Sequence, residues 1–423
     1  MLIGIPRYAR DYGKIAAECR HCPLKRVHTQ FTAAQSVHRK RADKIELVRK
    51  LYEKWMVGWE TRLTERDTNR VVRPFEWGVE WTRAWPFVNG NFPQQAADHQ
   101  RYLHELNDEL VRNSDQFFAY QTPRDYRLER RQVELFATRS NPQNEAKYRD
   151  QQAEFLRFTS PVASPYPENN LANARWFPAE KKTKRAVVVL PHWNSDAISH
   201  NALCRAFNWF GISALRLSMP YHDIRRPREL QRADYAVSSN VCRTIDAGRQ
   251  AVIDIRCCLD WLAAQGYSEF GILGTSLGSC YAFLASAHDE RLRVNVFNHA
   301  STYFADVVWI GQSTRHIRAG AEPAVELDTL RRAWACISPT CYMDKYARWP
   351  KRSMVIYAKY DLTFPPQFSR QVVEEFARRN FDFNHVELPC GHYTTGESPF
   401  KFLDGYHIVK AMVRGFSAAD ERR

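Results

Sequence analysis

The feature that most constrains the fold is an apolar strand that leads directly into a turn bounded by glycines. Residues 269–273 (EFGIL) have the composition of a buried strand, and Gly274-Thr275-Ser276-Leu277-Gly278 follows without a break. The small side chains of residues 278–287 then predict a helix. Glycines on both sides of Ser276 permit a turn too tight for larger residues. The segment therefore predicts a strand–turn–helix unit that presents the Ser276 hydroxyl at one edge of a sheet.

The chain on either side of this turn alternates between strand-like and helix-like patterns. Several strand-like segments are apolar on both faces, which is typical of a parallel sheet covered by helices. The alternation predicts an α/β fold with a mostly parallel sheet and helices on both faces. Strands are predicted at 131–137, 154–159, 185–190, 212–218, 269–273, 293–298, 353–358 and 383–388. Helices are predicted near 199–210, 239–264, 278–287, 366–380 and 402–417, with a Pro- and Asn-rich loop at 161–170 and an insert at 299–350.

Residues 1–125 predict a mostly helical extension ahead of a catalytic domain at 126–423. Segment 43–66 carries an apolar stripe at helical spacing, and 96–119 carries a weaker one. An amphipathic helix has to bury its apolar face against something. The polar face of 43–66, which includes Glu60, mixes acidic and basic side chains, as a solvated outer surface does. We therefore expect this helix to pack on the catalytic domain with Glu60 facing solvent.

Basic residues are concentrated at the N-terminus of this 423-residue chain, whose formal net charge is +14. Residues 1–50 hold 12 basic and 4 acidic side chains. We expect residues 1–41 to be a solvated, poorly ordered arm, and nucleic acid is an unlikely partner because no groove-reading motif accompanies the charge. No apolar run approaches the ~18 residues that span a bilayer, and the first residues lack the apolar core of a signal peptide. The expected location is the cytoplasm.

Ten cysteines in a long chain without a secretory signal do not predict a disulfide framework. Cys19-Arg-His-Cys22 is a C-x-x-C pair, and His28 is a candidate third ligand. A structural zinc site requires four ligands, and nothing at finger-like spacing supplies the fourth. We therefore expect no bound metal.

With its flanking elements, Gly274-Thr275-Ser276-Leu277-Gly278 resembles the nucleophile elbow of the α/β-hydrolase superfamily, especially its dienelactone-hydrolase-like and esterase-like members. The resemblance covers about residues 130–423 and implies a triad in the order serine, acid, histidine. It places the acid at Asp361, just after strand 353–358, and the histidine at His392, in the loop after strand 383–388. Asp306 is the alternative acid, whereas His385 and His407 are expected to be structural.

The resemblance also implies two backbone donors for an oxyanion. One is the amide of Leu277, and the other belongs to the loop after strand 185–190, Pro191-His192-Trp193-Asn194. Related sequences often carry His-Gly here, and this chain lacks the glycine. We favour the Trp193 amide, with Asn194 as the alternative, and expect His192 to shape the loop.

Two further regions lie where this fold builds its substrate pocket. Arg225, Arg226 and Arg228 follow strand 212–218 and could bind an anionic group, although a solvated basic loop is the alternative. The insert at 299–350 occupies the usual place of a lid. Its side chains Phe304, Trp309 and Trp334 could form an apolar acyl wall or pack within the lid itself.

Together these features predict a serine hydrolase that cleaves a carboxylic ester or a related acyl compound through an acyl-enzyme on Ser276, with no metal or organic cofactor. The substrate would be a small-molecule or lipid-like acyl compound. An acyltransferase and a non-catalytic binding protein on the same fold are the alternatives. The sequence leaves the acyl chain length and the oligomeric state open.

Overall fold

The computed structural model describes residues 23–133, 151–181 and 183–420, with side chains described from residue 43 to residue 417 within those ranges. The chain divides into two compact units between Gly58 and Trp59. Helix α2 (Pro23–Glu65) supplies the described part of the first unit, and its last residues open the second. None of the described helices is long and apolar enough to cross a membrane.

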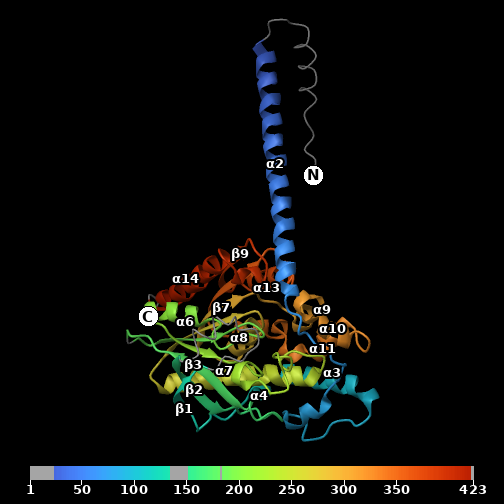
Figure 1. Ribbon diagram of the computed structural model, residues 1–423, viewed down its shortest axis with the longest axis vertical. Helices are drawn as coiled ribbons and strands as arrows, with labels where there is room; N and C mark the ends of the chain where they lie inside the picture. The colour runs from blue at the N-terminus through green and yellow to red at the C-terminus, as the bar shows by residue number, and fades with distance from the viewer. Residues whose placement is uncertain (1–22, 134–150, 182, 421–423) are drawn as a thin grey trace. The chain divides into compact units, whose positions relative to one another are not determined.

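A nine-stranded sheet among the described residues forms the centre of the second unit (Figure 1). Its order is β1-β2-β3-β5-β4-β6-β7-β8-β9. The six strands from β4 to β9 run parallel, whereas β1, β2 and β3 are antiparallel to their neighbours. The strands are β1 (Arg127–Gln132), β2 (Gln152–Thr159), β3 (Leu171–Phe177), β4 (Arg185–Leu190), β5 (Ser213–Leu217), β6 (Glu269–Thr275), β7 (Leu292–Asn298), β8 (Arg352–Ala358) and β9 (Asp382–Leu388).

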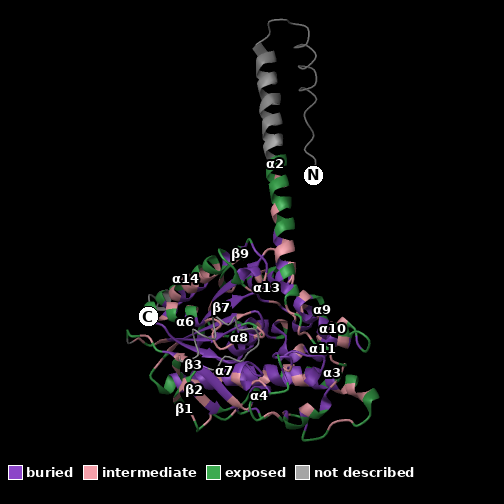
Figure 2. Ribbon diagram, viewed as in Figure 1, coloured by how far each residue is buried: buried purple, intermediate pink, exposed green. Residues whose placement is uncertain are grey.

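Helices cover both faces of this sheet. Helices α7 (Val241–Ala264), α8 (Leu277–His288) and α13 (Pro366–Arg378) pack on one face, where Phe283 of α8 contacts Phe376 of α13. Helices α6 (Asn201–Trp209) and α14 (Phe400–Asp420) pack on the other face. Strands β3 to β8 between these layers are mostly buried (Figure 2), whereas β1 and β9 at the edges of the sheet are largely exposed or half-buried.

The segment between β7 and β8, where the insert at 299–350 is predicted, forms a cluster of short helices. Helices α10 and α11 both pack on α9. The cluster comprises α9 (Phe304–Ile310), η3 (Gln312–Thr314), α10 (Arg315–Ala321), α11 (Leu327–Ala333), η4 (Ala335–Ile337), η5 (Pro339–Tyr342) and α12 (Met343–Tyr346).

Part of the predicted extension belongs to the core of the second unit. Helix α3 (Ala96–Arg112) packs on α11, and the short helix η1 (Val79–Ala84) packs on α7. Leu103, Leu110 and Phe117 are fully buried in the same apolar cluster as the residues of α7 and α8. The remaining short elements are α4 (Ser114–Phe117), η2 (Asp223–Arg225) and η6 (Thr394–Gly396).

The predicted α/β-hydrolase fold is confirmed, and the structure adds detail at its first strands. Strand β3 occupies 171–177, which the sequence did not predict as a strand, because buried polar side chains interrupt its apolar pattern. Of the strand predicted at 131–137, residues 134–137 lie outside the described residues. The domain boundary at residue 125 and the packing of segment 43–66 stay predictions.

Candidate active site

The turn between β6 and α8 holds Ser276 in a conformation that few residues other than glycine adopt. Its φ is 57° and its ψ is −120°, and such strain persists where the surrounding structure enforces it. A Cβ atom on Gly274 would lie 2.2 Å from the Gly278 carbonyl oxygen, and one on Gly278 would lie 2.6 Å from the Pro191 carbonyl oxygen. Both positions therefore require glycine, for reasons of space rather than of φ.

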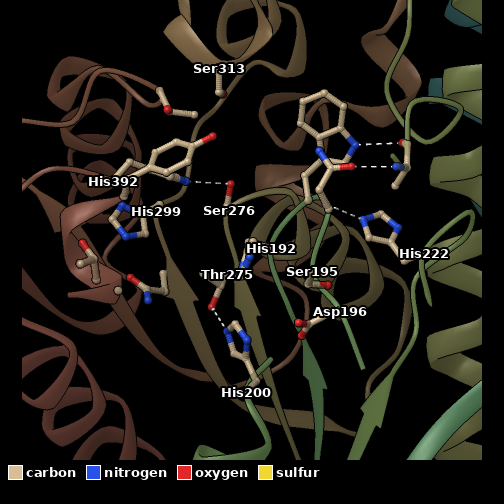
Figure 3. A pocket seen from close by; sticks show the side chains of 18 of the residues that line it. His192, Ser195, Asp196, His200, His222, Thr275, Ser276, His299, Ser313 and His392 are labelled. Atoms are coloured by element: carbon tan, nitrogen blue, oxygen red, sulfur yellow. Dashed lines mark hydrogen bonds between the residues drawn. The ribbon is translucent and has the colours of Figure 1, made fainter. Parts of the chain in front are cut away.

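Ser276 begins a chain of hydrogen bonds that continues through His392 to Asp361. The Ser276 hydroxyl lies 3.1 Å from His392 Nε2, and His392 Nδ1 lies 2.8 Å from Asp361 Oδ2. Figure 3 shows the Ser276 hydroxyl facing the His392 ring. Because a carboxylate oxygen only accepts, Nδ1 carries the proton and Nε2 is left to accept from Ser276. The structure thus brings together three residues that are far apart in the sequence.

Four donors hold the Asp361 carboxylate. Besides His392, the His299 ring donates to the same oxygen over 3.0 Å, and the amides of Thr363 and Phe364 donate to the other oxygen over 2.8 and 2.6 Å. Burial raises the pKa of Asp361, but the two histidines outweigh burial and hold that pKa below its ordinary value. Asp361 is therefore a fixed carboxylate that stays ionised at neutral pH.

The His392 imidazole is enclosed by side chains that restrict its orientation. The Phe364 ring is stacked on it at a centroid distance of 5.3 Å, and the His299 ring lies 4.4 Å away. Burial lowers the pKa of His392, whereas the Asp361 carboxylate and, more weakly, Glu60 raise it, so that the net shift is upward. Burial lowers the pKa of His299, which therefore adds no second cation at neutral pH.

Two backbone amides beside Ser276 have no hydrogen-bond partner among the described residues, namely those of Leu277 and Trp193. The Asn194 amide, by contrast, donates to His222 Nε2 over 3.1 Å. The other ring nitrogen of His222 donates to the Pro220 carbonyl oxygen, and burial lowers the pKa of His222 to about 3. His222 is thus a neutral acceptor that occupies the Asn194 amide, and the sequence did not predict this role.

Two cavities meet at Ser276. The larger, of about 580 Å³, has both polar and apolar walls, and its polar residues include His192, Asp196, Arg226, Arg232 and Asp404. The smaller, of about 50 Å³, is almost entirely apolar. Ser276 and Trp193 line both cavities. The residues that line the small cavity are Trp193, Val237, Ser276, Leu277, Cys280, Ser301, Tyr303, Phe304, Val307, Val308, Ser313, Thr314, Pro339, Thr363 and Phe364.

A family described as alpha/beta hydrolase domain containing 18 matches residues 116–311, which include the Ser276 turn. Acetyl xylan esterase 1 from Thermoanaerobacterium sp. JW/SL YS485 shares the fold with a TM-score of 0.50 at 14% identity, over 77% of this chain and 99% of that one. The chain is thus similar to this family over somewhat less than half of its length, and it has the α/β-hydrolase fold.

Two further solved structures have lower TM-scores to this chain. An acetyl xylan esterase from Paenibacillus sp. R4 has a TM-score of 0.49 at 13% identity, over 76% of this chain and 96% of that one. An acylaminoacyl peptidase from Pyrococcus horikoshii has a TM-score of 0.43 at 9% identity, over 64% of this chain and 39% of that one, so the chain spans well under half of the peptidase. At these identities the likeness concerns the fold alone. No curated protein sequence matches the chain.

The alternative site residues lie elsewhere or have other partners. Asp306 lies on α9 and pairs with Arg331 at 2.6 Å. His385 lies on β9 and His407 on α14, and neither is among the described residues that line the two cavities. Among the aromatic residues predicted for the insert, Phe304 lines the small cavity, and the Trp334 ring packs edge-on against Phe304.

The three predicted arginines differ in their surroundings. Arg225 is fully buried and pairs with Asp254 at 2.8 Å, so it stabilises the fold. Arg226 lines the large cavity, and Arg228 is exposed. Arg232, which the sequence analysis did not single out, lines the same cavity and lies over the Trp193 ring at 5.2 Å.

Ligand atoms of His299, Asp361 and His392 lie within 4.8 Å of one another, close enough for a metal ion. Those atoms already face one another in hydrogen bonds, and His392 also faces Ser276, so the hydrogen-bonded arrangement accounts for their proximity. Cys19 and Cys22 lie outside the described residues, as does the side chain of His28.

Proposed function

We propose that this α/β hydrolase is a serine hydrolase that cleaves a carboxylic ester through an acyl-enzyme on Ser276. The observation that carries the proposal is the series of hydrogen bonds from Ser276 through His392 to Asp361. Ser276 lies in a strained turn and lines two cavities. A serine hydroxyl is a weak nucleophile near neutral pH and becomes effective when an oriented base takes its proton.

In the first half-reaction, Ser276 Oγ attacks the ester carbonyl carbon while its proton passes to His392 Nε2. The Asp361 carboxylate keeps the proton of Nδ1 in place and stabilises the imidazolium that forms. The carbon–oxygen bond to the alcohol then breaks, and His392 returns its proton to the leaving oxygen. The alcohol departs, and the acyl group remains on Ser276.

In the second half-reaction, a water molecule replaces the alcohol. His392 takes a proton from the water as its oxygen attacks the acyl carbon, and Ser276 recovers that proton when the acid leaves. The large cavity beside Ser276 has room for both the alcohol and the water that follows it. The same room would admit an acceptor alcohol, in which case the protein would be an acyltransferase.

The amides of Leu277 and Trp193 are the proposed donors to the oxyanion of the tetrahedral intermediates. Each lies beside Ser276 at the wall of the small cavity, and neither has another partner among the described residues. Asn194 is the weaker candidate because its amide already donates to His222. One such donor contributes about 3–4 kcal/mol to transition-state stabilisation in a well-studied protease.

The two cavities differ in size and polarity, and this difference suggests which of them binds the acyl group and which binds the alcohol. The apolar cavity suits the acyl group, and at about 15 Å³ per water-sized group its 50 Å³ accommodate roughly three or four non-hydrogen atoms. The larger cavity, which carries polar and charged side chains, suits the alcohol, which would meet Arg226, Arg232 and the Asp404 carboxyl group. The proposed substrate is therefore an ester of a short acyl group with a polar alcohol.

A fluorophosphonate probe and p-nitrophenyl esters test this proposal. We expect the purified protein to be labelled and to hydrolyse p-nitrophenyl acetate, and we expect Ser276→Ala to lose both properties. Ser417→Ala, on the exposed side of α14, is the matched control and should keep both. Adding an acceptor alcohol separates transfer from hydrolysis, because a transferase would release acylated alcohol instead of acid. Absence of labelling in folded protein would contradict the mechanism.

A further inference from the structure

Glu60 is a fully buried carboxylate close to the proposed catalytic histidine. It lies near the end of α2, within the unit formed by residues 59–423, and its exposed fraction is 0%. Helical periodicity placed it on a charged, solvated face, and the structure shows that this prediction was wrong. A buried carboxylate is costly unless hydrogen bonds or charges compensate it, so its partners decide what it does.

The partners of Glu60 are the two backbone amides that directly follow His392. The amide of Tyr393 donates to Glu60 Oε1 over 2.8 Å, and the amide of Thr394 donates to Oε2 over 2.9 Å. These are the only donors recorded for this carboxylate among the described residues, and no Lys or Arg pairs with it there. A charged group thus holds the main chain next to His392, although it lies more than 300 residues earlier in the sequence.

Glu60 also constrains the residue that precedes His392. A Cβ atom on Gly391 would lie 2.4 Å from Glu60 Oε2, and the three nearest heavy atoms would all belong to Glu60. No positive φ is required at Gly391, so its lack of a side chain serves the approach of the carboxylate. The Glu60 carboxylate therefore contacts the main chain on both sides of His392.

The loop that carries His392 also has hydrogen bonds between its own residues. Thr394 Oγ1 accepts the Gly391 amide over 2.6 Å, and Thr395 Oγ1 donates to the Gly391 carbonyl oxygen over 2.7 Å. These bonds close the loop on itself, whereas the Tyr393 and Thr394 amides donate to Glu60, which belongs to another element. Burial raises the pKa of Glu60 and the Tyr393 amide opposes this rise, as expected for a carboxylate held by backbone donors.

We propose that Glu60 is a positioning residue that fixes the main chain around His392 and thereby aims Nε2 at the Ser276 hydroxyl. This inference rests on the proposed hydrolase function. His392 is held from three sides, by Asp361 at Nδ1, by the neutral His299 ring and by Glu60 through the main chain. A displacement of about 1 Å at a reacting group costs on the order of 100-fold in rate, so a group that prevents it affects turnover without touching substrate.

Glu60→Gln is the main test because it keeps the shape but presents an NH₂ group to one of the two amides. We expect kcat for p-nitrophenyl acetate to fall ~10- to 100-fold while KM changes by less than about twofold. The acid limb of kcat/KM should move to lower pH, because the titratable groups around the imidazole are Asp361, Glu60 and the neutral His299 and His192, and one negative charge is lost. Glu65→Gln, an exposed residue of the same helix, is the matched control.

A double-mutant cycle with Gly391→Ala tests the contact itself. In the wild-type background the new Cβ collides with the Glu60 carboxylate, and we expect a ~100-fold loss of kcat. In the Glu60→Ala background the collision is absent, so Gly391→Ala should add less than about threefold. Multiplicative losses would overturn the proposal, as would wild-type kcat and an unmoved acid limb in Glu60→Gln.

A proton NMR measurement separates this proposal from the hydrolase proposal. The His392 Nδ1–H bonded to Asp361 should give a downfield resonance, identified by its loss in His392→Ala. We expect Glu60→Gln and Gly391→Ala to shift or broaden it, and Glu65→Gln to leave it unchanged. If wild-type protein neither labels nor turns over ester, the hydrolase proposal fails, while the resonance still decides whether Glu60 positions the ring. An unchanged resonance in both variants overturns the positioning role.

Discussion

Gly278→Ala is the most informative single change in the elbow, because it acts on both proposed oxyanion donors at once. The added Cβ would lie 2.6 Å from the Pro191 carbonyl oxygen and 2.7 Å from the Leu190 carbonyl oxygen. These carbonyls end β4 and lead into the loop that carries Trp193, whereas Gly278 follows Leu277 at the start of α8. The methyl group therefore pushes the two donor-bearing segments apart.

The expected loss of stability and of kcat in Gly278→Ala depends on whether the atoms that the new methyl group meets can move away. The two carbonyl oxygens are main-chain atoms at the end of β4, which pairs with β5 on one side and with β6 on the other. Neither oxygen can therefore rotate away as a side chain would. Overpacking of this kind costs about 1–3 kcal/mol, and we expect the upper part of that range. Misplacing one oxyanion donor should lower kcat by about 100- to 1000-fold.

Chemical denaturation and ester turnover measure the two effects separately. Gly58→Ala is the matched control, because a Cβ at that helical position meets no atom within 4 Å. We expect the control to be neutral or stabilising by up to about 1 kcal/mol, with unchanged kcat. Folded Gly278→Ala protein with wild-type stability and kcat would refute both the steric reasoning and the assignment of the donors.

Three further predictions concern the charges and the cavities. Burial lowers the pKa of His392, but Asp361 and Glu60 raise it by more, so kcat/KM should rise with pH along a limb whose midpoint lies above about 6.5, measured by a pH–rate profile. Burial raises the pKa of Asp404 from 3.8 to about 7 in the folded protein, which removes stability as pH rises from about 4 to 7. At about 1.36 kcal/mol per pKa unit, Asp404→Asn should therefore stabilise the protein by up to about 4 kcal/mol at pH 8 and by much less at pH 4, measured by denaturation at both values. The 50 Å³ apolar cavity predicts that kcat/KM for p-nitrophenyl esters falls at least about 10-fold from butyrate to octanoate, and equal rates along the series would show that the acyl group binds elsewhere.

Most of the parallel part of the sheet could be predicted because the strands from β4 to β8 are buried on both faces. β4, β6 and β8 are short runs of apolar residues, and each matches a predicted segment closely. β3 escaped prediction because Asn173 and Arg175 interrupt its apolar pattern, although both are buried. Asn173 donates to the Ser218 hydroxyl, a contact that no local pattern reveals.

The three residues of the proposed triad could be located because each occupies a position that the fold defines. Ser276 follows β6, Asp361 follows β8 and His392 follows β9, and the ends of parallel strands meet at one edge of a sheet. A sequence that reveals its strands and the order of its elements therefore also indicates which polar residues at strand ends can meet.

The residues that support the hydrogen bonds of the proposed triad could not be predicted, because they act through the backbone or through neutral rings. His299 follows β7 and shares Asp361 with His392, whereas His222 accepts the Asn194 amide. Glu60 belongs to a helix whose polar face has the pattern of a solvated surface, and only the fold shows that one carboxylate on that face points inward. Hydrophobic periodicity cannot distinguish a buried, hydrogen-bonded acid from an exposed one.

Truncation from the N-terminus tests how far the catalytic unit extends toward the start of the chain. A protein that lacks residues 1–41 keeps Glu60 and all the described core residues, and we expect it to fold and turn over ester nearly as the full chain does. A protein that lacks residues 1–125 loses Glu60 and the buried side chains Leu103, Leu110 and Phe117. Burial of each such side chain contributes about 1.5–3 kcal/mol, so these three alone approach the 5–15 kcal/mol that stabilise a whole domain. The loss of η1 and α3 also exposes the faces of α7 and α11 on which they pack, so we expect aggregation. A 126–423 fragment that is soluble, monomeric and fully active in size-exclusion chromatography and ester turnover would show that the extension is a separate module.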